Sequence, residues 1–246
     1  MNYIRDAILQ LMANMPLFNG QQAVPINPEW PTDPYALALF SLCCLADPDV
    51  ALDIGTGKGR SGMAIVLALH AMGKKLSCFT TFDTGIGKWT AKVPVFHKNL
   101  LDRYGIDITQ TNWVKADFKT LDADRYVPDR GAVFLFYDIH DHHGGVSVQP
   151  EPSSPVLLKN WLPRIREGIV AVHDMSPVPP GYELTAKDKK THVSYSVAVH
   201  KKSGQWYKGF GECARIIDWL NNLGGQLLAV PNTSLVYFRV REGKPL

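Results

Sequence analysis

The sequence has little of the features that would place a chain in a specialised class. It has only four cysteines, Cys43, Cys44, Cys78 and Cys213, and no two of them form a Cys-x-x-Cys pair. This spacing argues against a disulfide framework and against a zinc site, and it fits a reducing compartment. The net charge of +3 is also too small to indicate a nucleic-acid-binding protein by itself.

Long hydrophobic runs are missing as well. No apolar stretch approaches the ~20 residues of a membrane-spanning helix, and the N-terminal residues lack the basic-then-apolar layout of a signal peptide. We therefore expect a cytoplasmic protein without a membrane partner. The remaining composition, 46% hydrophobic and 20% charged residues in a chain of 246, fits one globular α/β domain with an appended helical segment.

The centre of the chain alternates apolar runs with helical segments. The predicted strands are residues 50–54, 75–82, 111–116, 132–137 and 168–172. The predicted helices between them are residues 60–72, 90–104 and 155–166. Because these strands are apolar on both faces, they predict a parallel sheet that helices cover on each side.

The C-terminal part predicts a different connection. A helix over 211–223 precedes two strands, 226–230 and 235–241, which are joined by only four residues. So short a connection can join only antiparallel strands, and it therefore predicts a hairpin. The predicted fold is α/β: a mostly parallel seven-stranded sheet with a C-terminal antiparallel hairpin and helices on both faces.

The N-terminal segment reads as a separate helical unit. Residues 1–47 predict an N-terminal helical cap with helices over 3–15 and 34–46, ahead of a main domain over 48–246. A proline at position 34 is compatible with the first turn of the second helix.

One insertion interrupts the main domain. Residues 176–209 are too long for an ordinary connection between a strand and a helix. They carry six lysines and a single acid between 187 and 208, and an alternating stretch over 193–197. We expect either a solvated insertion with a small strand or a lid that closes over the substrate.

The most specific motif ends the first central strand and opens a helix. It is the run Asp53-Ile54-Gly55-Thr56-Gly57-Lys58-Gly59. Glycine lets such a turn approach a ligand without an intervening Cβ, although a purely structural turn would use it too. A P-loop would need Lys-Ser or Lys-Thr, and a dinucleotide turn would need GxGxxG, whereas the spacing here is GxGxG. The candidate binding residues of the run are Asp53, Gly55, Thr56, Gly57 and Gly59.

Two further acids close the next strands. Asp83 ends the second strand, where a carboxylate can accept both hydroxyls of a ribose, and this alone would suit NAD equally well. Asp117 ends the third strand, where it can accept an adenine amino group while Phe118 packs on the ring; the ordinary alternative is that Asp117 caps a helix. Because ligands bind at the carboxyl edge of a parallel sheet, acids on three consecutive strand ends predict a binding site there.

The form acid-x-Gly-x-Gly-x-Gly, with the acid at a strand end, resembles motif I of the class I SAM-dependent methyltransferases. The resemblance covers residues 48–175 and 211–241, and the C-terminal hairpin is similar to the end of the sheet in that family. It implies the Rossmann-like methyltransferase fold. It also implies S-adenosyl-L-methionine (SAM) as the cofactor, bound by the residues of the glycine turn and the acids just named.

A second polar group follows the fourth and fifth strands. The chain continues from the fourth strand as Asp138-Ile139-His140-Asp141-His142-His143, and from the fifth as His173-Asp174. Adjacent strand ends bring Asp138, Asp174 and several imidazoles toward one cleft. Two carboxylates there would repel each other unless a cation or a proton lay between them. Oxygen ligands suit Mg²⁺, and histidines suit Zn²⁺, Mn²⁺ or Fe²⁺.

This layout resembles the metal-dependent small-molecule O-methyltransferases of the macrocin O-methyltransferase and cephalosporin hydroxylase group. By position, the resemblance implies Asp138 and Asp174 as ligands of Mg²⁺ or another divalent cation. His173, which stands where that group usually has an acid, is the third candidate ligand. It implies a base at His142, allowing for one inserted residue, with His143 and Asp141 as reserves. The alternatives are a metal-free site with one histidine as the base and a merely polar turn.

These features together predict a SAM-dependent methyltransferase that methylates a hydroxyl of a small molecule with the help of a divalent cation. Aromatic residues near the expected cleft, Trp89, Trp206, Tyr207 and Phe210, fit a flat or glycosidic acceptor, and the lysines of the insertion fit an acidic one. Nucleic acid is disfavoured, because these lysines do not alternate with aromatics along a long stripe. The alternatives are an NAD-dependent oxidoreductase and a SAM-binding protein without activity. The oligomeric state, a homo-oligomer included, is left open.

Overall fold

The computed structural model describes most of the main domain. The described residues are 34–57, 59–84, 101–102, 104–139, 142–143, 146–147, 154–173, 182–188, 194–200, 202, 206–207, 214–230 and 235–246. The helix predicted over 3–15 lies outside these residues, as does most of the helix predicted over 90–104.

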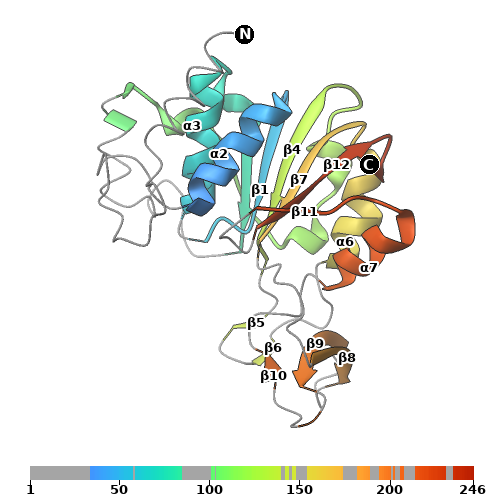
Figure 1. Cartoon of the computed structure of the whole chain (residues 1–246). Helices are drawn as coiled ribbons and strands as arrows, with labels where there is room; N and C mark the ends of the chain where they lie inside the picture. Colours follow the sequence, from blue (N-terminus) through green and yellow to red (C-terminus); the bar gives the residue numbers. More distant parts are fainter. Residues whose placement is uncertain are drawn as a thin grey trace, which may run out of the picture.

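One large sheet forms the centre of the molecule (Figure 1). Its strands lie in the order β11-β12-β7-β4-β1-β2-β3, and β13 pairs with the C-terminal end of β12. Their bounds are β1 Val50–Ile54, β2 Phe79–Asp83, β3 Asn112–Lys115, β4 Ala132–Tyr137, β7 Glu167–Val172, β11 Leu228–Ala229, β12 Val236–Arg241 and β13 Lys244–Pro245. The second strand starts later than predicted, because Leu76–Cys78 form a 3-10 turn before it.

The strand directions confirm the predicted fold class. Neighbours from β3 through β7 are all parallel, whereas β12 runs antiparallel to both β7 and β11. The chain moves outward from β1 to β3 and then returns to β4 on the other side of β1. This mostly parallel, seven-strand path with an antiparallel C-terminal hairpin is the arrangement of the Rossmann-like methyltransferase fold. The switch point between β1 and β4 is where such sheets bind ligands, at their carboxyl ends.

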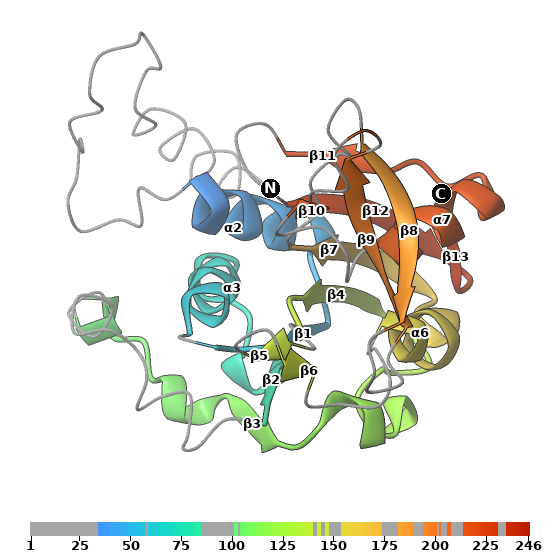
Figure 2. The same ribbon diagram turned by 90° about the horizontal axis from the view of Figure 1, so that it is seen from below.

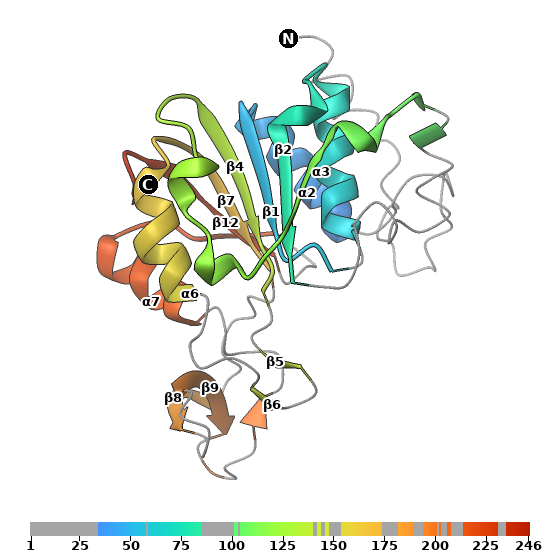
Figure 3. The same ribbon diagram turned by 180° about the vertical axis from the view of Figure 1, so that it is seen from behind.

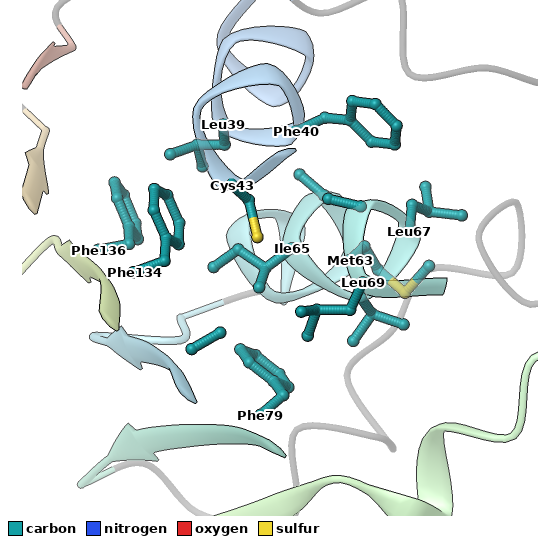
Figure 4. Packing of buried hydrophobic residues seen from close by; sticks show 14 of the residues in the cluster. Leu39, Phe40, Cys43, Met63, Ile65, Leu67, Leu69, Phe79, Phe134 and Phe136 are labelled. Carbon is teal, nitrogen blue, oxygen red and sulfur yellow. The ribbon is translucent and has the colours of Figure 1, made fainter. Parts of the chain in front are cut away.

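Helices cover both faces of the sheet, as predicted. The face toward α2 (Pro34–Ala46) and α3 (Arg60–Ala71) buries an apolar cluster that includes Leu39, Ile65 and Phe134 (Figure 4). The opposite face packs against α6 (Ser154–Val156) and α7 (Ala214–Leu223), as Figure 3 shows. Because strand residues alternate between faces, Leu52 and Ile54 belong to the second cluster. Ala51 and Asp53 therefore face α2 and α3.

The helical segment predicted over 155–166 is present, but it is not a uniform α-helix. After α6 it continues as a π turn over Leu157–Trp161 and a 3-10 turn over Leu162–Arg164. Pro163 has no N–H with which to continue the α-helical hydrogen-bond ladder, which is a common cause of such a change.

Two small antiparallel sheets lie beyond the carboxyl rim, the edge of the large sheet at which β1, β2, β4 and β7 end (Figures 1 and 3). The short pair β5 (His142–His143) and β6 (Val146–Ser147) follows β4, and the insertion forms a three-stranded sheet of β8 (Tyr182–Asp188), β9 (Ser194–His200) and β10 (Trp206–Tyr207). Figure 2 looks onto the rim and shows β5–β6 on the side of β1 and β2, and β8–β9 on the side of β7 and β12.

The insertion thus contains three strands where the sequence predicted one. Whether it closes over a substrate stays a prediction, as does the domain boundary after residue 47. No helix among the described residues is long and apolar enough to cross a membrane.

Candidate functional site

The glycine turn that follows β1 is tied to the end of β2. The backbone N–H groups of Gly55 and Thr56 both donate to the carbonyl oxygen of Phe82, at 3.0 and 3.2 Å. The N–H of Gly59 donates to the carbonyl of Thr56 at 2.7 Å, and Gly59 is also the N-cap of α3. The turn is therefore a defined loop at the switch point, between the ends of β1 and β2 and the first turn of a helix.

Two glycines of the turn are required for different reasons. Gly55 has a φ of +96°, and a Cβ built there would lie 2.0 Å from the carbonyl oxygen of Asp138. This position thus allows the turn to pass directly against the end of β4. Gly57 has a φ of +50°, and apart from its chain neighbours no described atom lies closer than 3.9 Å to a Cβ built there, so its outer side is open within the described part of the chain.

Asp83 holds the open part of this turn. Its Oδ2 accepts a hydrogen bond from the N–H of Gly57 at 2.8 Å, and the side chain is half-buried at the end of β2. The structure therefore brings Asp83 and the turn together, as predicted from the strand ends. Its contact with a ribose stays a prediction.

Asp53 lies beneath the turn and is completely buried. Thr81 donates to its Oδ2 at 3.1 Å, while Oδ1 has no hydrogen-bond partner of ordinary geometry among the described residues. Burial, together with the carboxylates of Asp138 and Asp83, raises the pKa of Asp53 to about 7, although the hydroxyls of Ser61 and Thr81 oppose this. No described lysine or arginine contributes to lowering it.

The ends of β4 and β7 bring two further predicted residues together. The Nδ1 of His173 lies 3.3 Å from the Oδ1 of Asp138, and both side chains are about a quarter exposed or less. Asp138 is fixed by its N–H, which donates to the carbonyl of Ile54 at 2.8 Å. The adjacency predicted from the strand order is therefore present.

The sequence interpretation did not include Tyr35, which completes this group. Its ring lies 4.6 Å from the ring of His173 and 5.9 Å from that of Phe136, measured between centroids. Tyr35 reaches the rim because it stands in the first turn of α2, which packs against β4 and β7. The predicted helix over 34–46 contained this signal, but no motif linked its first turn to residue 173.

The described residues do not assemble a metal centre on their own. Asp138 and His173 supply two possible ligands, and no group of three or more histidine, cysteine, aspartate or glutamate side chains gathers within the described ranges. Asp141 and Asp174 lie outside those ranges, and for His142 and His143 the structure describes only the backbone of β5. We therefore assign no chemical step to a metal ion, and the predicted roles of these residues stay predictions.

Asp117 and Phe118 have clear structural roles at the end of β3. Asp117 caps the 3-10 turn Phe118–Thr120 by accepting from the N–H of Lys119 at 3.0 Å. Phe118 is 3% exposed and packs 4.8 Å from Trp161 and 6.0 Å from Tyr137 between ring centroids. Adenine binding by these two residues stays a prediction. Of the four aromatics expected near the cleft, Trp206 and Tyr207 form β10, and Trp89 and Phe210 lie outside the described residues.

Comparisons with known proteins find only distant structural likenesses. No protein-family model and no curated protein sequence matches this chain. A proposed caffeoyl-CoA O-methyltransferase from Staphylococcus aureus matches with 13% identity and a TM-score of 0.49, covering 98% of this chain and 99% of the other. An SAH-bound methyltransferase from Podospora anserina matches with 11% identity and a TM-score of 0.45, over 98% and 88% of the two chains. Likenesses this distant carry no functional argument, so the function must come from the site.

Proposed function

We propose that this chain is a SAM-dependent methyltransferase that transfers the methyl group to a hydroxyl of a small molecule. The observation that carries the proposal is the group of three carboxylates, Asp53, Asp83 and Asp138, around the glycine turn. Asp83 and Asp138 both disfavour the ionised form of Asp53, and no described lysine or arginine acts on Asp53 to oppose them. A ligand that carries positive charge would stabilise all three.

SAM fits these residues well. Its sulfonium and amino groups carry the positive charge that would stabilise the carboxylates. The Oδ1 of Asp53, which has no partner of ordinary geometry among the described residues, is a buried acceptor beneath the turn. The open side of Gly57 lets a ligand approach the backbone, and Asp83 stands beside it to accept hydroxyl groups. The N-terminus of α3 has no acidic residue in its first turn and favours a carboxylate.

The same charges argue against the NAD-dependent alternative. A dinucleotide places its pyrophosphate against the glycine turn, where helix N–H groups bind it. Here Asp83 and Asp138 add negative charge beside the turn, which disfavours a doubly charged pyrophosphate relative to SAM with its sulfonium. A protein that binds SAM without catalysis would share the site, and only turnover separates it from the proposed enzyme.

SAM, when bound, supplies a methyl group that is already electrophilic. The chain must hold the acceptor oxygen in line with that group and remove its proton, and positioning alone can contribute ~7–11 kcal/mol. We propose His142 as the base, because β5 and β6 follow β4 at the rim, on the side of β1 and β2 (Figure 2). A neutral imidazole is well suited to accept a proton near neutral pH.

His142→Ala is expected to lower kcat by about 100-fold or more, since a positioned general base contributes ~10²–10⁴. The Kd for SAM should stay within about twofold of that of the unsubstituted protein, because the base contacts the acceptor and not the cofactor. Steady-state kinetics and calorimetry measure the two quantities. His143→Ala is the matched control from the same strand; a larger loss there would move the role to His143, and equal turnover in both variants would remove β5 from the mechanism.

Assistance by a divalent cation is the second part of the proposal. Its support is the approach of Asp138 and His173 at the rim. Removal of metal with a chelator is expected to lower turnover, and Mg²⁺ or Mn²⁺ should restore it. Full activity after exhaustive chelation would leave the metal-free alternative in place.

The decisive test of the cofactor is ligand-dependent stability. At a concentration of 100 times Kd, SAM should stabilise the folded protein by ~2.7 kcal/mol, which corresponds to a rise in Tm of roughly 5 °C or more. NAD at the same concentration should leave Tm unchanged. A shift with NAD and none with SAM would overturn the proposal, and a SAM shift without methylation of any acceptor in a broad panel of small alcohols and phenols would favour the non-catalytic alternative.

A further inference from the structure

A small polar cluster is buried inside the larger apolar core. The buried polar residues of this cluster are Asp53, Thr56, Ser61 and Thr81, whereas Thr80, also buried, lies on the opposite face of the sheet. Asp53 is the one ionisable group in this set. It lies on the face of the sheet that α2 and α3 cover, opposite Thr81 of β2 and Phe136 of β4 in the strand register. A buried carboxyl group in such surroundings needs a specific account of its charge.

A chain of three polar contacts joins this carboxyl group to the glycine turn. The Oδ2 of Asp53 lies 3.1 Å from the Oγ1 of Thr81, and Thr81 in turn contacts the Oγ1 of Thr56. Thr56 Oγ1 lies 3.2 Å from the carbonyl oxygen of Phe82, which already accepts the N–H groups of Gly55 and Thr56. These contacts therefore connect the buried carboxyl group to the Phe82 carbonyl, which accepts the N–H groups of the turn.

Whether all three of these polar contacts can be hydrogen bonds depends on the protonation state of Asp53. Three contacts each require one proton, but the two threonine hydroxyls supply only two. When Asp53 is ionised, Thr81 donates to it, and the proton of Thr56 can serve either Thr81 or the Phe82 carbonyl, but not both. When Asp53 is protonated, each group donates to the next, from Asp53 through Thr81 and Thr56 to Phe82, and every contact is satisfied. With Asp53 protonated, all three contacts are therefore hydrogen bonds; this series from Asp53 through Thr81 and Thr56 to Phe82 is the hydroxyl ladder.

The charges around Asp53 favour the same state while no cation is present. Within the described part of the chain, the charged groups that act on it are Asp83, at the end of β2, and Asp138, directly after β4, and both raise its pKa. Ser61 from α3 and Thr81 from β2 contribute only hydroxyls, and Phe136 on β4 and the apolar face of α2 contribute no charge. The side chains of Lys58 and Arg60 are not among those described.

We propose that Asp53 binds a proton in the cofactor-free protein and releases it to solvent when a cationic cofactor occupies the glycine turn. This inference rests on the proposed function and concerns how its site senses charge. No covalent bond changes in this step: one proton leaves the carboxyl group for the buffer as SAM binds. Methyl transfer then removes the sulfonium charge, so that SAH is held less strongly by the ionised acid and the proton returns.

The consequence is a pH-dependent preference between SAM and SAH. Because a proton must leave before the cation is bound well, the affinity for SAM should rise as the pH rises through the pKa of Asp53, at about 7. From pH 6 to pH 8 the expected gain is roughly tenfold for SAM and clearly smaller for SAH. Since both ligands carry the same amino group, the difference between them isolates the sulfonium.

Isothermal titration calorimetry tests this directly. At pH 7, titrations in two buffers of different ionisation enthalpy should show the release of about half a proton per SAM bound to the unsubstituted protein. In Asp53→Asn this proton release should disappear, together with the rise in SAM affinity with pH, because an amide cannot ionise. Equal proton release in the two proteins would overturn the inference.

A second variant covers the case in which Asp53→Asn does not fold. Thr56→Val removes one hydroxyl and two contacts of the ladder, so the single remaining contact is satisfied by Thr81 without a proton on Asp53. The midpoint of the pH dependence of SAM affinity should therefore move to lower pH, and an unchanged midpoint would contradict the ladder. Should the unsubstituted protein bind no SAM at any pH, the proposed function itself would fail. SAM binding without these proton effects would refute only the inference about Asp53.

Discussion

Gly55→Ala is expected to abolish SAM binding and to lower the free energy of unfolding by about 3 kcal/mol or more. The new Cβ would lie 2.0 Å from the carbonyl oxygen of Asp138, a distance at which one of the two backbones must move. The φ of +96° adds strain for any residue with a side chain, and strain and overpacking each cost ~1–3 kcal/mol. Denaturant unfolding and calorimetric titration with SAM measure the two effects.

The matched control is Gly73→Ala in the turn after α3. Gly73 has a similarly left-handed φ of +69°, but among the described residues beyond its chain neighbours no atom lies within 4 Å of a Cβ built there. Gly73→Ala should therefore lower the free energy of unfolding only by the ~1–2 kcal/mol cost of a left-handed backbone conformation, and it should bind SAM normally. Equal losses of stability in the two variants would show that the contact with β4 does not constrain the turn, and normal SAM affinity in Gly55→Ala would remove the turn from the cofactor site.

The fold could be predicted from the sequence because its strands and connections follow from local patterns. Strands such as Ala132–Tyr137 are apolar on both faces, and this pattern identifies a parallel sheet covered by helices without any knowledge of distant contacts. The four-residue connection predicted at 231–234 fixes an antiparallel hairpin by length alone. Once the strand order follows, the meeting of Asp138 with His173 is a consequence of the topology.

The sequence could not predict contacts in the site between side chains that lie far apart along the chain. Asp53 was predicted as a cofactor-binding acid, and nothing in its motif indicated that its buried carboxyl group would be hydrogen-bonded to Thr81. Tyr35 was not identified, because its contact with His173 depends on how α2 packs on the sheet. In the insertion, the lysine-rich composition concealed the strand β8, which pairs with β9 over its full length. These features depend on tertiary packing, which periodicity cannot report.

The second large effect is expected at Asp83. Asp83→Ala should raise the Kd for SAM by about 100-fold or more, because it removes the acceptor of the Gly57 N–H and the proposed acceptor of two ribose hydroxyls. Hydrogen bonds to a charged group contribute ~1.5–3 kcal/mol each. Asp83→Asn should lose less, since an amide oxygen can still accept from Gly57. The Tm should fall by only a few degrees, because the bond to Gly57 lies at the rim and not in the core.

The opposite edge of the sheet supplies the matched control for this prediction. There Asp49 accepts from the N–H of Ala132 at 2.9 Å, a bond of the same kind that also lies beside a glycine with positive φ, Gly131. Asp49→Ala should lower Tm about as much as Asp83→Ala and leave the Kd for SAM unchanged, because it is at the amino ends of the strands. If both variants bind SAM within twofold of the unsubstituted protein, Asp83 serves only to hold the turn, and the ligand must be bound elsewhere on the rim.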